Sequence, residues 1–274
     1  MRDHGVYNNY GLEICMGLSL LCGAVASTIY HLCPNSITYN LDTPFIQLLC
    51  ILIILKLFGN RRETVKAQTV NMAAVFVIFV NSIITMFAKR SLTRSLVIIC
   101  LPFLVLVAIS KVFRPTLSPG RRGIATKRPL FVSLIAITVN ILMAITFILP
   151  ADRIQSNQIV TVICLINAFL YFVYYVFSKW CFGEQLCQFS RICSAVAVFL
   201  WISALYFFLV EETDWALTPA QSRARNRPCV LMSFFDYHDL WHITSALASL
   251  VTLMAVSTID DAVSALPRGA LAVF

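Results

Sequence analysis

Stretches of mainly apolar residues, most of them about 20 residues long, recur along almost the whole chain. A helix of that length crosses the hydrocarbon core of a bilayer, whereas a soluble domain does not need such stretches one after another. Hydrophobic residues make up 59% of the chain and charged residues only 12%, about half the share that soluble domains carry. The sequence therefore predicts a single membrane domain that covers residues 1–274.

We expect about eight membrane spans, all of them helical. Helices and closed barrels alone satisfy backbone polar groups within lipid, and runs such as Leu96 to Ile109 lack the alternation of a barrel strand. The predicted fold class is therefore all-α, a polytopic bundle of transmembrane helices. The predicted spans cover residues 11–31, 43–58, 68–87, 94–113, 129–150, 158–178, 192–210 and 239–257.

Lys and Arg are divided unevenly between the two sets of loops that eight spans create. The set that contains both termini holds 14 of the 21 basic residues, and the other set holds 7. Cytosolic loops are enriched in Lys and Arg, so both termini are predicted to lie in the cytosol. The net charge of +8 is then explained by topology and does not by itself indicate a nucleic-acid binder. The loops near residues 32–42 and 211–238 are predicted to face the outside or a lumen.

Three of the four histidines stand at ends of predicted spans on that non-cytosolic side. His238 and His242 are four residues apart, which places both imidazoles on one helical face and suits two ligands of one zinc ion. His31 ends the first span and Asp42 opens the second, so these groups can meet without a break in any helix. Charged groups at membrane depth are costly and commonly mark function. The sequence therefore predicts a metal site formed by His31, His238, His242 and Asp42.

The polar residues near the ends of the spans also have plainer interpretations. Ser27 lies one helical turn before the first of these histidines, but alone it would be expected to hydrogen-bond to its own helix. Asp42 alone would be expected to be the N-cap of a helix that starts near Pro44. Asp260 and Asp261 are expected to form a solvated helix end.

Cys33 and Cys229 are placed by this topology in two different loops on the non-cytosolic side, where oxidation is permitted. Most of the ten cysteines fall inside spans, where Cys behaves as a small apolar residue. We therefore expect a disulfide between Cys33 and Cys229 that joins the first loop to the entrance of the last span.

Several sequence strings carry a resemblance to a known family: STIYHLCPNSITYNLDT, ALYFF, TPAQSRARNRPC, FFDYHDLWH, STIDD and a tail that ends in VF. In order and spacing they resemble the C-terminal half of the systemic RNA interference defective (SID) transmembrane family. The resemblance implies a channel or transporter for double-stranded RNA in the plasma membrane or in endolysosomal membranes, with some relatives linked to cholesterol. Family members carry a large extracellular region and further spans ahead of this segment. We therefore expect the chain to be the C-terminal part of a longer architecture.

The same strings are similar, more distantly, to alkaline ceramidases and adiponectin receptors, a superfamily of zinc hydrolases. Their Ser-x-x-x-His, Asp and His-x-x-x-His elements correspond here to Ser27 with His31, to Asp42, and to His238 with His242. The resemblance implies that the three histidines bind zinc together with a water. It also implies that Asp42 contacts this water and that Ser27 lines the reaction site.

Three functions stay open. The first is an RNA conduit, which rests on the resemblance, because no span carries a row of Lys or Arg to stabilise phosphate charge in transit. The second is a zinc-dependent lipid amide or ester hydrolase, in which Ser27 supports the oxyanion and Asp42 takes a proton from water. The third is binding of cholesterol or another membrane lipid between spans. The sequence does not fix the oligomeric state, and a homodimer is one option.

Overall fold

The computed structural model describes residues 4–32, 36–61, 137–143, 156–210 and 229–274, together with residues 72, 75, 76, 79, 82, 135 and 221. Long helices dominate this part: α1 (Tyr10–Leu32), α2 (Ser36–Asn60), α6 (Ser156–Cys181), α7 (Gln188–Val210) and α9 (Tyr237–Thr258). Two 3-10 helices, η1 (Asp261–Val263) and η2 (Arg268–Ala270), follow α9. Five helices of the described part are long and apolar enough to cross a membrane, which confirms the predicted helical transmembrane fold.

The predicted spans agree with these helices to different degrees. The spans at 11–31, 158–178, 192–210 and 239–257 fall within α1, α6, α7 and α9. The span at 43–58 also falls within a helix, α2, but this helix begins earlier, at Ser36, and carries Pro44 inside it, so Asp42 is not an N-cap. Proline removes one backbone hydrogen bond, but a membrane bundle can compensate through neighbouring groups. The spans at 68–87, 94–113 and 129–150 lie wholly or largely outside the described residues, so the total of about eight stays a prediction.

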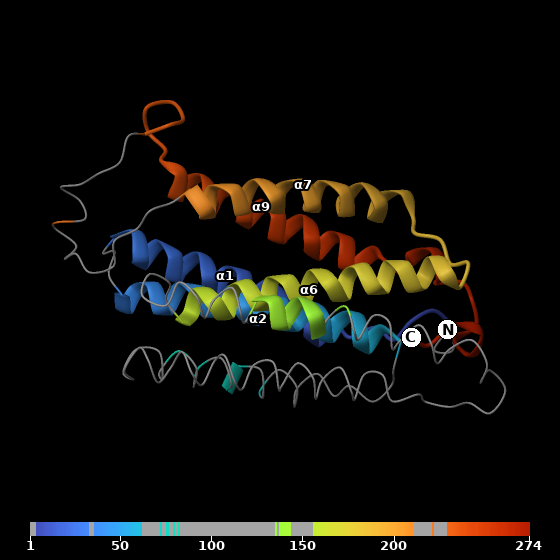
Figure 1. Ribbon diagram of the computed structural model, residues 1–274. Coiled ribbons are helices and arrows are strands. Elements are labelled where there is room, and N and C mark those ends of the chain that lie inside the picture. The colour runs from blue at the N-terminus through green and yellow to red at the C-terminus, as the bar shows by residue number, and fades with distance from the viewer. Residues whose placement is uncertain are drawn as a thin grey trace.

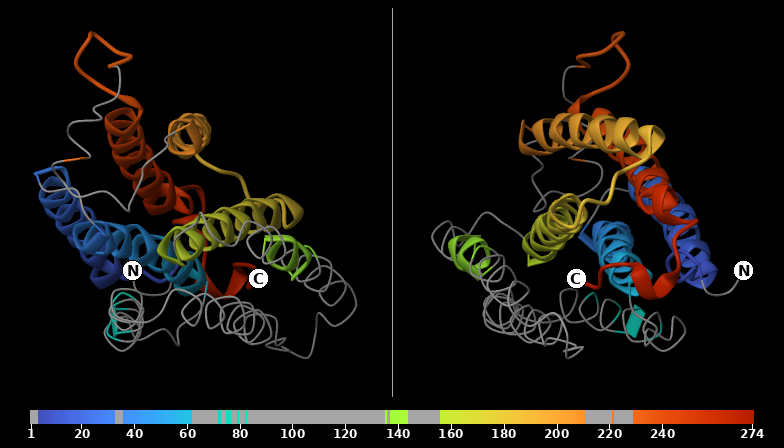
Figure 2. Two further views of the ribbon diagram at one scale, coloured as in Figure 1. Left: turned by 60° about the vertical axis from the view of Figure 1, so that its left-hand side comes forward. Right: turned by 90° about the vertical axis from the view of Figure 1, so that its right-hand side faces the viewer.

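The helices form two packed groups. Helix α7 lies along α9, and α2 lies between α1 and α6 (Figures 1 and 2). Helix α9 contacts α1 and α2 through far fewer residues than it contacts α7. Both termini lie at one end of the bundle, and α1 ends and α9 begins at the opposite end (Figure 1).

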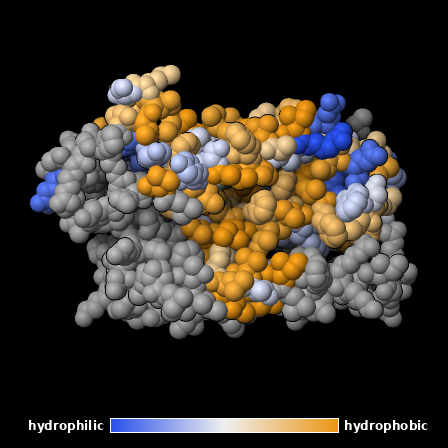
Figure 3. Space-filling model, turned by 45° about the horizontal axis from the view of Figure 1, so that its top comes forward, coloured by the Kyte–Doolittle hydropathy of each residue, from blue (hydrophilic) through white to orange (hydrophobic). Residues whose placement is uncertain are grey.

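Apolar side chains point outward along the helices, as contact with lipid requires. Figure 3 shows one such face, where apolar side chains cover the helices and hydrophilic ones gather toward the ends. On α1 the exposed apolar residues recur at helical spacing on one side, namely Ile14, Leu18, Leu21, Val25 and Ile29. Contiguous apolar surface of this extent is rare on soluble proteins and supports an integral membrane protein.

Helices α1 and α2 approach each other closely, which fixes the end of α1 relative to the rest of the bundle. A Cβ atom added at Gly23 would lie 3.3 Å from the Cβ of Phe45, and the Ser19 hydroxyl donates to the Phe45 carbonyl at 3.0 Å. The buried Lys56 ammonium, which interrupts the apolar run of α2, forms an ion pair with Glu13 of α1 at 2.6 Å. Small residues and paired polar groups of this kind are typical of contacts between membrane helices.

Candidate metal site

Two histidines lie on the first turns of α9 and face each other. The helix begins with a capping box, in which the Asp236 carboxylate accepts from the Asp239 N–H and the Asp239 carboxylate accepts from the Asp236 N–H. This start places His238 and His242 one turn apart, with their Nε2 atoms 2.9 Å from each other. The spacing of four residues therefore brings two imidazole nitrogens to one point, as the sequence predicts.

His31 completes the group from the last turn of α1. Its ring centroid lies 5.0 Å from that of His238 and 4.7 Å from that of His242. One donor atom from each of the three histidines lies within 4.8 Å of the others. Tetrahedral zinc with nitrogens at 2.0 to 2.1 Å separates those nitrogens by about 3.3 Å, so small side-chain rotations would bring all three into coordination. We call this end of the bundle the histidine end and the end that holds both termini the terminal end.

Ser27 contacts the outer side of one of these imidazoles. Its hydroxyl oxygen lies 3.1 Å from Nδ1 of His242, whereas Nε2 of the same ring faces His238. The plain expectation that Ser27 bonds within its own helix is therefore wrong, and the next residue, Thr28, makes that bond to the Ala24 carbonyl at 2.8 Å. In a neutral imidazole one nitrogen donates and the other accepts, so a hydrogen bond from Nδ1 to Ser27 would leave Nε2 free to bind a metal.

Two carboxylates border the three imidazoles. Asp42, buried on α2, lies close enough to His238 for electrostatic interaction, but it does not belong to the set of mutually close donor atoms. One oxygen of the Asp239 carboxylate lies 4.0 Å from Nδ1 of His31. Metal-binding histidines commonly donate their other N–H to a carboxylate, and Asp239 is suitably placed for this role toward His31. Sequence reasoning missed Asp239, although it sits between the two histidines of the α9 pair.

Comparison with known proteins decides the family. The family model described as "dsRNA-gated channel SID-1" matches residues 1–274. The chain belongs to the SID-1 RNA channel family. SID1 transmembrane family member 1 from Homo sapiens is 29% identical over 296 residues, which cover 99% of this chain and 35% of that relative. Cholesterol uptake protein 1 from Caenorhabditis elegans is 26% identical over 299 residues, which cover 99% of this chain and 38% of that relative.

This SID-1 family chain thus spans little more than a third of the length of the curated relatives that it matches. The expectation of a C-terminal part of a longer architecture stays a prediction. The structure does not test the predicted disulfide between Cys33 and Cys229. Cys33 lies outside the described residues, while the Cys229 thiol is exposed and lies 3.3 Å from the Phe234 carbonyl oxygen. The Cys33–Cys229 disulfide therefore stays a prediction.

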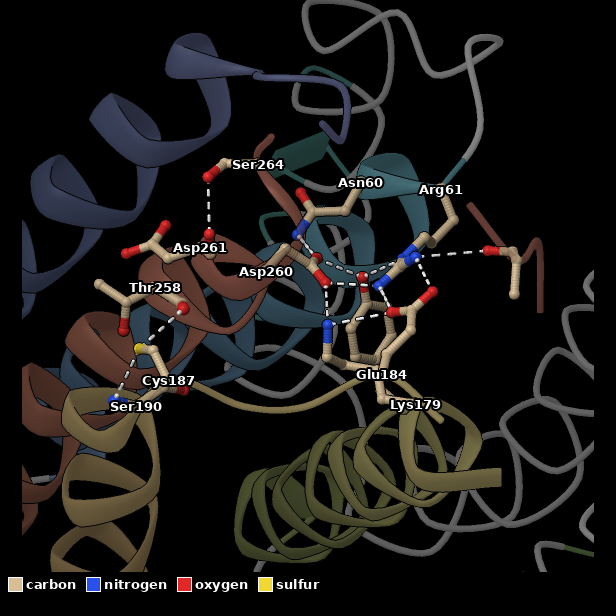
Figure 4. Close-up of polar contacts among 12 residues, drawn as sticks. Asn60, Arg61, Lys179, Glu184, Cys187, Ser190, Thr258, Asp260, Asp261 and Ser264 are labelled. Atoms are coloured by element: carbon tan, nitrogen blue, oxygen red, sulfur yellow. Dashed lines mark hydrogen bonds and ion pairs between the residues drawn. The ribbon is translucent and has the colours of Figure 1, made fainter. Parts of the chain in front are cut away.

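A second polar cluster of the SID-1 family chain lies at the terminal end, and sequence reasoning did not find it (Figure 4). We call it the ion cluster; its members come from the ends of α2, α6 and α9 and from the connection between α6 and α7, and are Asn60, Arg61, Tyr175, Lys179, Glu184 and Asp260. Asp260 is only 5% exposed, so the expectation of a solvated helix end is wrong for this residue. Its neighbour Asp261 is exposed, as expected.

The ion cluster balances its buried charges through short contacts. Glu184 accepts two hydrogen bonds from Arg61, at 2.7 and 3.0 Å, and Asp260 accepts from Lys179 at 2.7 Å. Gly183, with a φ of +74°, ends α6 in a turn that returns Glu184 to this helix. Burial alone favours the neutral guanidinium, but the hydrogen bonds to Glu184 and the charge of Asp260 raise the pKa of Arg61 above its ordinary value.

Sequence reasoning did not find this cluster because each member, taken alone, has an ordinary explanation. Arg61 and Lys179 follow apolar runs and read as topology signals, while Asp260 follows a helix end. A signal was present in the combination, because the predicted topology places basic residues at two span ends on the same side of the membrane as the acidic pair at a third span end. Asp260 lies 81 or more positions from each of its side-chain partners along the chain, so only the packed structure pairs them.

Proposed function

We propose that this chain is the membrane-embedded part of a protein that transports double-stranded RNA, and that His31, His238 and His242 hold a zinc ion at its histidine end. The match of the "dsRNA-gated channel SID-1" family model to residues 1–274 supports the transport function. The meeting of three imidazoles from α1 and α9 supports the metal. As the resemblance implies, the host is the plasma membrane or an endolysosomal membrane.

The donor set fits zinc better than the harder cations. Neutral imidazoles suit zinc, copper, iron and nickel, whereas magnesium and calcium prefer oxygen ligands. Three histidines and one open position form a common zinc coordination pattern. Ser27 supports the assignment independently, because its contact with Nδ1 of His242 directs Nε2 of that ring toward the other imidazoles.

Zinc would connect parts of the chain that otherwise touch little. His31 belongs to the α1–α2–α6 group, whereas His238 and His242 belong to the α7–α9 pair. An ion held by all three would therefore fix the relative position of the two groups at this end. In the RNA-transport function the zinc then has a structural role.

A second candidate function is hydrolysis of a lipid amide or ester. The observation that favours it is the placement of Asp42, buried beside His238 but outside the mutually close donor atoms. Zinc in such a site lowers the pKa of water to about 7 and polarises a carbonyl group. Asp42 would accept the proton of the attacking water. Ser27 would act mainly by orienting His242, because its hydroxyl contacts that ring.

Binding or uptake of cholesterol is a third candidate. Its support is a relative at 26% identity that is named Cholesterol uptake protein 1. The exposed apolar faces of the helices offer surfaces for a sterol, but they equally serve ordinary lipid contact. The sterol candidate therefore rests on the relative alone.

One pair of measurements separates these functions. Purified wild-type protein and His238→Ala are compared for zinc content and for uptake of labelled double-stranded RNA in cells. Loss of both zinc and uptake in the variant would support the proposed structural role of zinc in transport. Loss of zinc with full uptake would show that transport does not depend on the metal and would favour hydrolysis or a sterol-related role.

A further inference from the structure

The two packed groups of helices are joined mainly at their two ends. Among the described helices, α7 packs extensively on α9, and α2 packs extensively on both α1 and α6. The α7–α9 pair meets the other group through the much smaller contacts of α9 with α1 and α2. At the histidine end, α9 reaches α1 through Ser27, His31 and the α9 histidines. At the terminal end, Asp260 reaches α2 and α6 through the ion cluster, and Val256 and Ile259 pack in a buried apolar core shared with α1, α2 and α6.

In the ion cluster every hydrogen-bond donor of the Arg61 side chain has a partner. The five N–H groups of the Arg61 guanidinium match five hydrogen bonds: one to the Tyr175 hydroxyl, two to Glu184, one to Asp260 and one to the Ala272 carbonyl. The two cations and two carboxylates balance in charge. Asp260 also accepts from the Tyr175 hydroxyl, so each hydrogen bond of its side chain crosses to the other helix group. None of these contacts depends on a ligand.

The residues after α9 cover the ion cluster. The Phe274 ring stacks on the Arg61 guanidinium at 4.7 Å and lies 5.0 Å from the Tyr175 ring. It also stacks on the Phe182 ring at 5.9 Å with an interplanar angle of 12°. The segment that follows Asp260 therefore folds back and shields the cluster from water, which strengthens its charged contacts.

The histidine end, unlike the ion cluster, is partly exposed and contains a candidate ligand site. The side chains of His31 and Asp239 are each 37% exposed. Apart from that pair, the described contacts between α1 and α9 here that need no metal are ring contacts and one hydrogen bond, from Ser27 to His242 or the reverse. This end thus offers a contact that can form and break with metal binding.

We propose that the ion cluster holds the two helix groups together at the terminal end whether or not a ligand is bound. The metal site holds them together at the histidine end only while the metal is bound. Loss of the metal would let the α7–α9 pair move away from α1 at the histidine end while the terminal end stays closed. The proposal rests on the zinc site proposed above. It adds a direction of opening, because only one of the two connections depends on a ligand.

Distances between pairs of spin labels test this directly on the full chain in detergent or nanodiscs. Genetically encoded keto amino acids carry the labels, because ten native cysteines preclude thiol labelling. One pair, Leu32 with Ile243, reports on the histidine end, and the other, Trp180 with Ala265, reports on the terminal end. All four positions are exposed. Zinc content is measured on each sample before and after chelation.

On zinc removal, the Leu32–Ile243 distance is expected to lengthen by several ångströms and to broaden, while the Trp180–Ala265 distance is unchanged. In zinc-loaded Asp260→Asn the expectation reverses: the terminal pair broadens and the histidine pair holds. Asp261→Asn, the exposed neighbour, is the matched control and should leave both pairs unchanged. Phe274→Ala keeps every charge of the cluster and should broaden the terminal pair, which keeps the test available if Asp260→Asn does not fold.

Three outcomes would overturn the proposal. An unchanged Leu32–Ile243 distance after verified zinc loss would show that the metal site does not hold the two helix groups together. Equal changes at both pairs would show that the terminal end does not stay closed. An unchanged Trp180–Ala265 distance in both Asp260→Asn and Phe274→Ala would show that the ion cluster does not hold the terminal end together. Wild-type protein without zinc would instead contradict the proposed metal site, and the Asp260→Asn arm would still decide whether the ion cluster holds the terminal end together.

Discussion

The Ser27 hydroxyl oxygen lies 3.1 Å from Nδ1 of His242, so a side chain of α1 contacts an imidazole of α9 on the side that faces away from His238. This geometry assigns Ser27 a different task from the one that the family resemblance implies. A serine bonded to the outer nitrogen orients a ligand and sets its tautomer. It is less well placed to meet a reacting carbonyl.

Ser27→Ala should therefore weaken zinc binding about 10- to 100-fold, the usual effect of losing an outer-shell partner. The matched control is Thr28→Ala, because the Thr28 hydroxyl bonds to its own helix at the exposed side of α1. Competition with a chelator of known affinity measures both variants. Equal zinc affinity in Ser27→Ala and wild type would show that the hydrogen bond does not orient His242.

The hydrolase hypothesis makes its sharpest prediction at Asp42. Asp42→Asn keeps the size of the side chain but removes the proton acceptor, so turnover of a lipid amide or ester should fall at least about a hundredfold. Zinc content, measured on the same samples, should change little, because Asp42 is not among the mutually close donor atoms. Wild-type turnover no higher than that of Asp42→Asn, with zinc bound in both, would exclude hydrolysis and leave the site structural.

Asp260 offers a prediction about stability. Asp260→Asn leaves two buried cations beside a single carboxylate, and removing one partner of a buried ion pair usually costs about 3–5 kcal/mol. The neighbouring Asp261→Asn, at an exposed position, should stay within about 0.5 kcal/mol of wild type. Unfolding midpoints in detergent, by denaturant or heat, compare the two variants. Similar midpoints would mean that the cluster contributes little to the free energy of unfolding.

The amino-acid sequence predicts the parts of this molecule that depend on local periodicity. Five predicted spans fall within observed helices, and the i to i+4 spacing of His238 and His242 correctly places their imidazoles side by side. The start of α2 was missed because Asp42 and Pro44 resemble a helix start, although the lipid setting tolerates a proline within the helix.

What the sequence could not supply is the pairing of distant polar groups. The contact between Ser27 and His242 joins residues 215 positions apart, and that between Arg61 and Asp260 joins residues 199 positions apart. Each of these side chains has a reasonable local partner or a solvated alternative when only its neighbours are considered. Helix packing removes that choice, because burial makes an unpaired polar group costly.

The disulfide between Cys33 and Cys229 is tested by peptide mapping without reduction. A cross-linked peptide that contains both residues is expected, since the predicted topology places both on the oxidising side. Cys187, which the same topology places in the cytosol, should stay reduced and serves as the control. Free thiols at both Cys33 and Cys229 would contradict either the pairing or the predicted sidedness of the loops.

Elemental analysis of the purified protein tests most directly whether three histidines from α1 and α9 hold a metal. Wild-type protein should carry one zinc ion per chain, and His31→Ala, His238→Ala and His242→Ala should each lose it while remaining folded by circular dichroism. Wild-type protein without stoichiometric metal after purification in zinc-containing buffer, or three histidine variants that all retain zinc, would contradict the proposed metal site.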